Sequence, residues 1–262
     1  MCDDEPTKEE KWKKQAWSKF KGFQFLWIDQ GASNALKRVD SSGVCFALTR
    51  DYVDCCRTSK TDVKAFTDAF RAVQQKEDPD TVPEKYITLQ AQYVAALKAD
   101  NLAVGELSDK LETADDTTKP TKAELVEQLK AIRLRKFRMP ATGYGVIKSS
   151  LVALEDSIRN IKEAAAEGPA YFMLSFFKPG KGGHVVGFEY RPDLTVNKLL
   201  PKRFTFIDAN LGLYFFKDFE QMLDFFYLAV WTEIYNMRDY TRFEIAMFDK
   251  GSIAPDETET TQ

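Results

Sequence analysis

Cys45, His184 and Asp208 are the side chains of this sequence whose types and order suggest nucleophilic chemistry. Cys45 follows two serines and a glycine at positions 41–43 and begins an apolar run, a pattern that predicts a helix starting at the cysteine. N–H groups at a helix start are unpaired and partly positive, so a thiol there is expected to ionise more readily than a free thiol. A small buried thiol without reactivity is the alternative interpretation.

His184 is the sole histidine, and it follows a glycine-rich turn at the start of an apolar run that extends to Tyr190. Asp208 ends an aromatic run that begins at Phe204. Taken singly, a core histidine and a turn-forming aspartate are equally good interpretations. Taken together, a nucleophile at a helix start, a base on a strand and an acid on a later strand are typical of papain-like cysteine hydrolases.

The elements that must position these residues change character along the chain. Helical spacing of apolar residues dominates the first part, and aromatic and β-branched runs separated by turns dominate the second. We therefore predict an α+β fold, papain-like, in which a helical half carrying the nucleophile packs on an antiparallel β-sheet carrying the histidine and the aspartate. The predicted strands span 171–177, 184–190, 204–208, 213–216 and 241–248, and an aromatic helix is expected over 218–231.

Local signals predict the remaining elements. A helix is expected over 9–20, a strand or a helix over 24–28, and a loop over 29–42. Capping-box patterns at 81–84 and 121–124 each predict a helix start, and a separate weaker helix is expected around 104–111. Pro140, Gly143 and Gly145 predict a break, and a further helix is expected from Leu151 to Ile161.

One catalytic domain accounts for most of the length. Residues 1–10 and 254–262 are predicted to be disordered tails. Residues 11–253 are predicted to form a single papain-like catalytic domain with a helical insertion at about 60–140.

Composition excludes several classes of function. A net charge of −3 provides no broad electrostatic case for nucleic acid. One histidine and four unclustered cysteines predict neither a metal site nor a cofactor, and reduced thiols indicate a cytosolic working compartment. The acidic N-terminus lacks the apolar core of a signal peptide, and no apolar run is long enough to predict a transmembrane segment.

Three segments resemble the signature blocks of the YopT-type papain-like cysteine peptidases. Ala209 stands where that family typically has proline, and Leu211 where it has an aromatic residue. The resemblance covers about 43–57 and 170–231 and leaves the helical block at 60–168 unmatched. The blocks are Gly43-Val44-Cys45-x-x-Leu48, Gly183-His184-Val185-Val186 and Phe206-Ile207-Asp208-Ala209-Asn210-Leu211-Gly212.

The resemblance implies a role for each residue. Cys45 would be the thiolate nucleophile, His184 would hold it as an ion pair and protonate the leaving amine, and Asp208 would orient the ring. The oxyanion hole would use the Cys45 N–H and one upstream side chain, a choice left open among four residues. These are Gln30, Asp40, Ser41 and Ser42.

The resemblance also implies a biological setting. The protein would be a bacterial virulence effector or toxin that is secreted without a cleaved signal peptide. It would cleave a protein substrate in a target-cell cytosol and would be restrained by an inhibitor or immunity protein. Without delivery, the cytoplasm is the expected compartment. The alternatives are a glutamine deamidase, acyltransferase or peptidoglycan amidase with the same triad, and an inactive binding module with a papain-like fold.

One basic cluster is not explained by this chemistry. Arg133, Arg135, Lys136 and Arg138 follow one another at the end of a predicted helix. A solvated helix end is the simpler interpretation, because cations are favoured at a helix C-terminus. A docking patch for an acidic partner, or for anionic lipid head groups in peripheral membrane contact, is the alternative.

Overall fold

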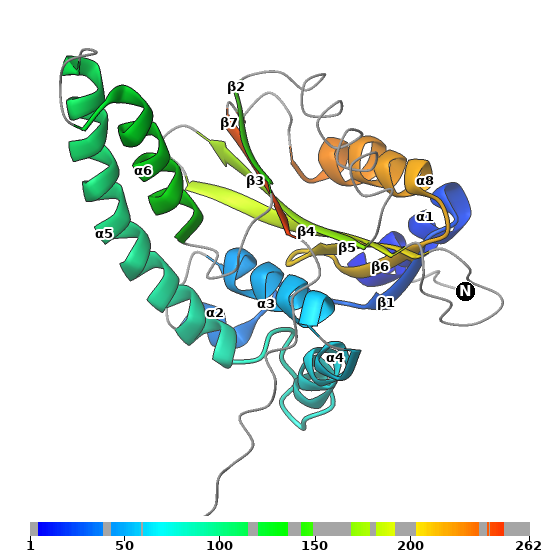
Figure 1. The fold of residues 1–262 in the computed structure, drawn as a ribbon. Coiled ribbons are helices and arrows are strands. Elements are labelled where there is room, and N and C mark those ends of the chain that lie inside the picture. The colour runs from blue at the N-terminus through cyan, green and yellow to red at the C-terminus, as the bar shows by residue number, and fades with distance from the viewer. Residues whose placement is uncertain are drawn as a thin grey trace, which may run out of the picture.

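In the computed structural model, a mixed sheet-and-helix architecture is described over residues 5–38, 43–58, 60–114, 120–135, 143–148, 169–178, 182–191, 203–235, 240 and 242–248. The described residues form a seven-stranded sheet in the order β1-β6-β5-β4-β3-β7-β2, and every neighbouring pair is antiparallel. Helices cover both faces of this sheet (Figure 1). The predicted α+β class is confirmed, as is the packing of the cysteine helix on a sheet that carries His184 and Asp208.

The strands agree with the aromatic and β-branched runs of the second half of the chain. β3 and β4 pair over their whole lengths, from Ala170 opposite Tyr190 to Lys178 opposite Gly182. They form the centre of the sheet, since β5 lies beside β4 and β7 beside β3. The bounds are β1 Phe23–Leu26, β2 Gly143–Lys148, β3 Ala170–Lys178, β4 Gly182–Arg191, β5 Arg203–Asp208, β6 Gly212–Phe216 and β7 Arg242–Phe248.

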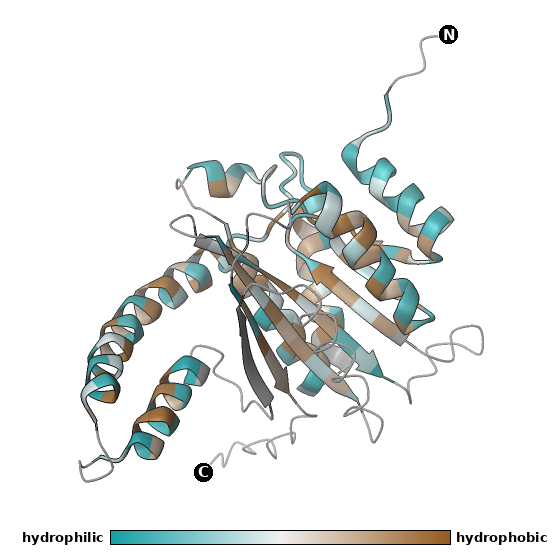
Figure 2. Cartoon of the chain, turned by 90° about the horizontal axis from the view of Figure 1, so that it is seen from above, coloured by the Kyte–Doolittle hydropathy of each residue, from teal (hydrophilic) through white to brown (hydrophobic). Residues whose placement is uncertain are grey.

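The helices fall into two groups around the sheet. α3 lies on one face with α4 beside it, and α8 and the π-helix η2 lie on the other face (Figure 1). α5 and α6 pack on each other and stand at one side of the sheet (Figure 2). The bounds are α1 Lys8–Phe20, α2 Asn34–Arg38, α3 Cys45–Thr58, α4 Lys60–Gln74, α5 Lys85–Thr113, α6 Lys122–Arg135, α8 Phe219–Asp224 and η2 Phe225–Trp231.

Alternation along the strands divides the core into two layers. Phe188 and Phe206 point toward η2 and α1 and pack with Trp231. Val185 and Ile207 lie three positions and one position away on the same strands and belong to the layer under α3. Side chains of a strand alternate between faces, so each central strand contributes to both layers. The sheet is therefore buried on both sides.

Gly187 sets the spacing between α3 and β4. A β-carbon at this position would lie 2.8 Å from Cγ2 of both Thr49 and Ile207, so only glycine permits the observed approach. The hydroxyl of Thr49 donates to the Val185 carbonyl at 3.3 Å, which anchors the helix to the strand. The start of α3 is thus held at a defined height over the sheet.

Several predicted boundaries need correction. α1 begins at Lys8, inside the predicted N-terminal tail, because Thr7 and Glu10 form a reciprocal capping box. α2 lies within the stretch 29–42 that was predicted as a loop. β2 spans Gly143–Lys148, where proline and glycine predicted a break. Pairing with β7 overrides the weak strand preference of these glycines.

The helical insertion also differs in detail. α5 is one continuous helix of 29 residues, not two. The predicted capping box at Thr121 and Glu124 forms, whereas the one at 81–84 does not. Thr81 instead donates its hydroxyl to the Asp29 carbonyl, so tertiary contacts outcompete the local cap. The predicted helix at 151–161 and the predicted C-terminal tail lie outside the described residues.

Among the described residues, no helix combines the length and the apolar character that a membrane span requires.

Candidate active site

Cys45 is the first residue of α3, and its thiol is partly exposed. Gly43 holds a φ of +130°, the left-handed region that favours glycine, and turns the chain into the helix. The N–H of Val44 donates to Gln30 Oε1 at 2.8 Å, and that of Ala47 donates to Gln90 Oε1 at 3.0 Å. Two glutamines therefore satisfy orphan donors of this helix start, a role predicted for serines 41 and 42, which lie outside the described residues.

His184 stands near the beginning of β4 and is buried. Its ring packs against two aromatic rings, with centroids 5.4 Å from that of Phe176 and 4.8 Å from that of Tyr235. The prediction that the histidine opens an apolar strand is confirmed. Because two aromatic rings pack against the histidine, its orientation is set by packing as well as by hydrogen bonds.

Asp208 ends β5 and is completely buried. Its Oδ1 lies 3.0 Å from His184 Nε2 and accepts from the Asn210 N–H at 2.7 Å. The second contact is the local turn bond expected of an aspartate two residues before an asparagine. One carboxylate therefore both closes the turn after the strand and contacts the histidine.

Tyr235 completes this cluster and was missed by sequence reasoning. Its hydroxyl lies 2.8 Å from His184 Nε2 and contacts both carboxylate oxygens of Asp208, at 3.0 and 2.8 Å. It also accepts from Asn210 Nδ2 at 2.7 Å. Tyr235 follows the predicted aromatic helix, and no motif or spacing distinguishes it from the many aromatic residues nearby.

The charge state of His184 follows from its neighbours. Burial alone would lower the pKa of the imidazole, but the charge of Asp208, the charge of Cys45 and hydrogen bonds to both residues raise it to about 10. The ring is therefore an imidazolium at neutral pH. Since Nε2 faces Asp208 and Tyr235, the nitrogen left to hydrogen-bond the Cys45 thiol is Nδ1.

The structure thus brings the three predicted residues together, from one helix and two strands. Of the four candidate oxyanion donors, Gln30 lies against the turn that leads into Cys45, and its Nε2 donates to Asn210 Oδ1 at 2.9 Å. Residues 40–42 lie outside the described residues. Within the basic cluster, Arg133 and Arg135 lie on α6, and positions 136 and 138 also fall outside the described part.

The neighbouring cysteines of α3 occupy different surroundings. Cys56 is buried and donates to Glu189 Oε2 at 3.3 Å, and burial raises the pKa of its thiol well above the ordinary value. Cys55 is partly exposed. A buried thiol with a raised pKa is a poor nucleophile at neutral pH, so the contacts of Cys45 set it apart from Cys56 on the same helix.

Within the described part of the chain, no group of three or more His, Cys, Asp or Glu side chains is placed to hold a metal ion.

Comparison with known proteins finds a structural likeness without a match in sequence. No protein-family model matches the chain, and no curated protein matches it either. The chain is similar to the crystal structure of the Pseudomonas avirulence protein AvrPphB, with a TM-score of 0.44 and 12% sequence identity, over 82% of this chain and 95% of that one. A likeness this distant says nothing about catalysis, so the chemistry depends on the side chains themselves.

Proposed function

We propose that this protein is a thiol hydrolase, a cysteine peptidase, with Cys45 as nucleophile, His184 as acid and base and Asp208 as the residue that orients the ring. One observation carries the proposal: Cys45, a partly exposed residue at a helix start, is hydrogen-bonded to the ring of His184, whose Nε2 contacts a buried carboxylate. A nucleophile, a base and an orienting acid in that relation activate a thiol for attack on a carbonyl.

In the first half of the reaction, the thiolate of Cys45 attacks the carbonyl carbon of the scissile amide. The S–C bond forms as the carbonyl π electrons move to oxygen. The tetrahedral intermediate then collapses, the C–N bond breaks, and the leaving amine takes the proton from His184. The product is an acyl-enzyme thioester and a neutral imidazole.

In the second half, His184 takes a proton from water while the resulting hydroxide attacks the thioester. The C–S bond breaks and the electron pair returns to sulfur, which restores the thiolate and the imidazolium. The N–H of Cys45 and Nε2 of Gln30 are the proposed oxyanion donors. Gln30 Nε2 carries two hydrogens, one of which binds Asn210, so the second is available for the oxyanion.

Alkylation by iodoacetamide tests the nucleophile directly. Peptide mapping of the native protein at pH 6.5 should show Cys45 modified about tenfold faster or more than Cys55, because a free thiol is only about 1% ionised there. Cys56, buried on the same helix, should stay unmodified and serves as an internal control. His184→Ala should remove the advantage of Cys45. Equal rates for Cys45 and Cys55 in the native protein would contradict the proposal.

The masses of the reaction products distinguish a peptidase from other enzymes that form the same acyl-enzyme. Incubation of a protein mixture with wild type and with Cys45→Ala, followed by mass spectrometry, should show new backbone termini in the wild-type sample alone. A gain of about one dalton at glutamine would indicate a deamidase, and a transferred group an acyltransferase, since all three form the same acyl-enzyme. No difference from Cys45→Ala would favour an inactive binding module.

The place of action stays a prediction. The proposal includes delivery into a target-cell cytosol, a protein substrate there and an inhibitor or immunity partner, because the family resemblance implies them. Expression of wild type inside candidate target cells should be harmful, whereas Cys45→Ala should be tolerated. Equal toxicity of both would argue against an effector that works by this chemistry.

A further inference from the structure

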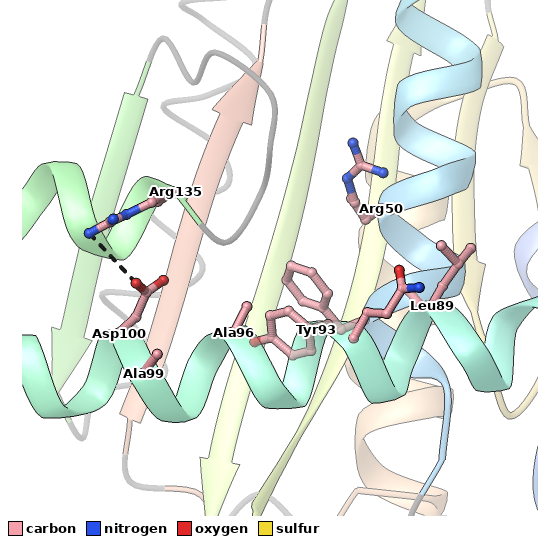
Figure 3. Close-up of a pocket in the computed structure, with 10 residues that line it drawn as sticks. Arg50, Leu89, Tyr93, Ala96, Ala99, Asp100 and Arg135 are labelled. Atoms are coloured by element: carbon pink, nitrogen blue, oxygen red, sulfur yellow. Dashed lines mark ion pairs between the residues drawn. The ribbon is translucent and has the colours of Figure 1, made fainter.

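A groove follows α5 and passes the sequence neighbours of both Cys45 and His184. Two cavities of about 280 and 250 Å³ make it up, and they adjoin because Tyr93 and Asp100 line both. The first cavity, drawn in Figure 3, is lined in part by Phe46, the residue after Cys45. The second reaches Phe177, which lies opposite Gly183, the residue before His184. The groove therefore runs alongside the proposed catalytic site.

The floor of this groove is apolar because α5 leaves its apolar stripe half covered. Tyr86 is the one buried side chain among the 29 residues of α5, all of which the structure describes. Tyr93 stacks on Phe46 with ring centroids 3.8 Å apart, and Leu89 stays 36% exposed beside them. An apolar surface of this kind, rimmed by polar side chains, is typical of a binding site.

The charged side chains of the groove are predominantly basic. Four arginines line it against two carboxylates, on a chain whose net charge is −3. Arg135 pairs with Asp100 at 3.6 Å, as Figure 3 shows, and Arg242 pairs with Glu244. Arg50 pairs with Asp54 at 3.9 Å, and Asp54 is not among the lining residues. Among the described residues, the lining therefore holds more arginines than carboxylates. The four arginines are Arg50, Arg133, Arg135 and Arg242.

We propose that the groove between the α5–α6 pair, α3 and the end of β3 with the start of β7 binds a segment of the protein substrate that carries acidic side chains next to apolar ones. The inference rests on the proposed function, because the bound segment would continue from the groove to Cys45. The apolar side chains would lie on Tyr93 and Phe46, and the carboxylates would face the arginines.

A peptide segment fits these features better than a membrane surface does. The arginines and the aromatic rings share a concave groove, and Arg242 lies over the Phe177 ring at 5.5 Å inside it. Lipid head groups are better contacted by cations on an exposed convex surface. The basic cluster predicted from sequence is thus explained in part, since Arg133 and Arg135 face the groove.

Binding measured without turnover tests the proposal. The probes are two short fluorescein-labelled peptide libraries, one of Asp, Glu, Leu and Phe, and one in which Asn and Gln replace the acids. Anisotropy with Cys45→Ala protein should show tighter binding of the acidic library, weakened by added salt. Removing two groove charges, in Arg133→Gln with Arg135→Gln, should weaken that binding about tenfold.

Matched variants on α6 make the test specific. Lys122→Gln with Lys130→Gln removes the same charge from exposed positions outside the groove and should leave peptide binding unchanged. Arg133→Lys with Arg135→Lys keeps the charge and should retain binding. Equal affinity for the two libraries, or equal loss in both glutamine variants, would overturn the proposal. So would binding of phosphatidylserine vesicles in place of peptides.

The two proposals can fail separately. Rapid alkylation of Cys45 together with equal binding of both libraries would leave the hydrolase standing and reject the acidic groove. Slow alkylation together with tight, salt-sensitive binding of the acidic library would keep the groove and reject the peptidase. In both cases the outcome is decided in the wild-type or Cys45→Ala protein, so no destabilised variant is needed.

Discussion

Asp208 is the side chain on which the chemistry of the site converges. Its carboxylate is completely buried and bonds to the histidine ring, a tyrosine hydroxyl and a backbone N–H. A buried carboxylate is costly unless its oxygens are paired, and here each oxygen has a partner. Tyr235 is therefore as much a part of the site as the residues that sequence motifs identify.

Tyr235→Phe should lower both the stability and the reactivity of the site. The change removes a donor to Asp208 and the acceptor for Asn210, which leaves buried polar groups unsatisfied and should cost about 1–3 kcal/mol in the free energy of unfolding. The His184 ring should also lose its fixed orientation. Urea unfolding and the pH profile of Cys45 alkylation measure the two effects.

Tyr214→Phe is the matched control for this prediction. Its buried hydroxyl accepts from Gln24 Nε2 at 2.8 Å, so the variant should also lose stability through an unsatisfied partner. Because none of these atoms contacts the histidine, Cys45 alkylation should keep its pH profile. A profile altered equally in both variants would show that Tyr235 acts only through general stability.

At the level of secondary structure, the site depends on how closely α3 approaches β4. The helix supplies Cys45 and the strand supplies His184, and Gly187 is the point where the two backbones come near each other. The π-helical turn η2 supports the opposite face, where Trp231 packs on Phe176 under the histidine. Packing on both faces of the sheet therefore fixes the positions of Cys45 and His184 relative to the sheet.

Gly187→Ala should separate α3 from β4 and slow Cys45 alkylation. The new β-carbon would lie 2.8 Å from two methyl groups, so the helix or the strand must shift, at a cost of about 1–3 kcal/mol in stability. Thermal melting and the alkylation rate measure the two effects together.

Gly105→Ala, on α5, is expected to have the opposite effect. A β-carbon there meets nothing within 4 Å, and alanine is favoured over glycine in a helix interior by about 0.5–1 kcal/mol. The variant should be slightly more stable than wild type and should alkylate at the same rate. If Gly187→Ala behaved like Gly105→Ala, the close approach of α3 and β4 would not be needed for the site.

For the molecule as a whole, the charge of His184 links folding to pH. Its pKa is raised in the folded protein to about 10, from an ordinary value near 6.5. A group with a raised folded-state pKa binds its proton more tightly when folded, so its stabilisation is complete below about pH 6.5 and is lost as pH rises toward 10. Among the described residues, the charges of Asp208 and Cys45 are the ones that raise this pKa.

The stability difference between wild type and His184→Gln should therefore shrink with increasing pH. Urea unfolding at pH 6 should give a larger difference than at pH 10, with a change on the order of a few kcal/mol. Comparing the two proteins at each pH cancels the titration of groups that they share. A difference that stays constant across this range would mean that the imidazolium does not stabilise the fold.

Much of the fold could be predicted from residue patterns. Aromatic and β-branched runs separated by turns identified the strands that carry His184 and Asp208, and alternation identified the last strand. The start of α3 at Cys45 was marked by a glycine and capping residues, which act over a few positions. The order Cys, His, Asp then followed from the sequence itself.

Contacts between distant segments could not be read in this way. Tyr235 reaches Asp208 across 27 positions and Gln30 reaches Asn210 across 180, and neither pair has a local signal. The unused capping box at 81–84 and the strand at 143–148 show tertiary pairing overriding local preference. Local patterns report on neighbours within about one helical turn, whereas the polar partners of a buried carboxylate and the walls of a groove depend on which surfaces meet.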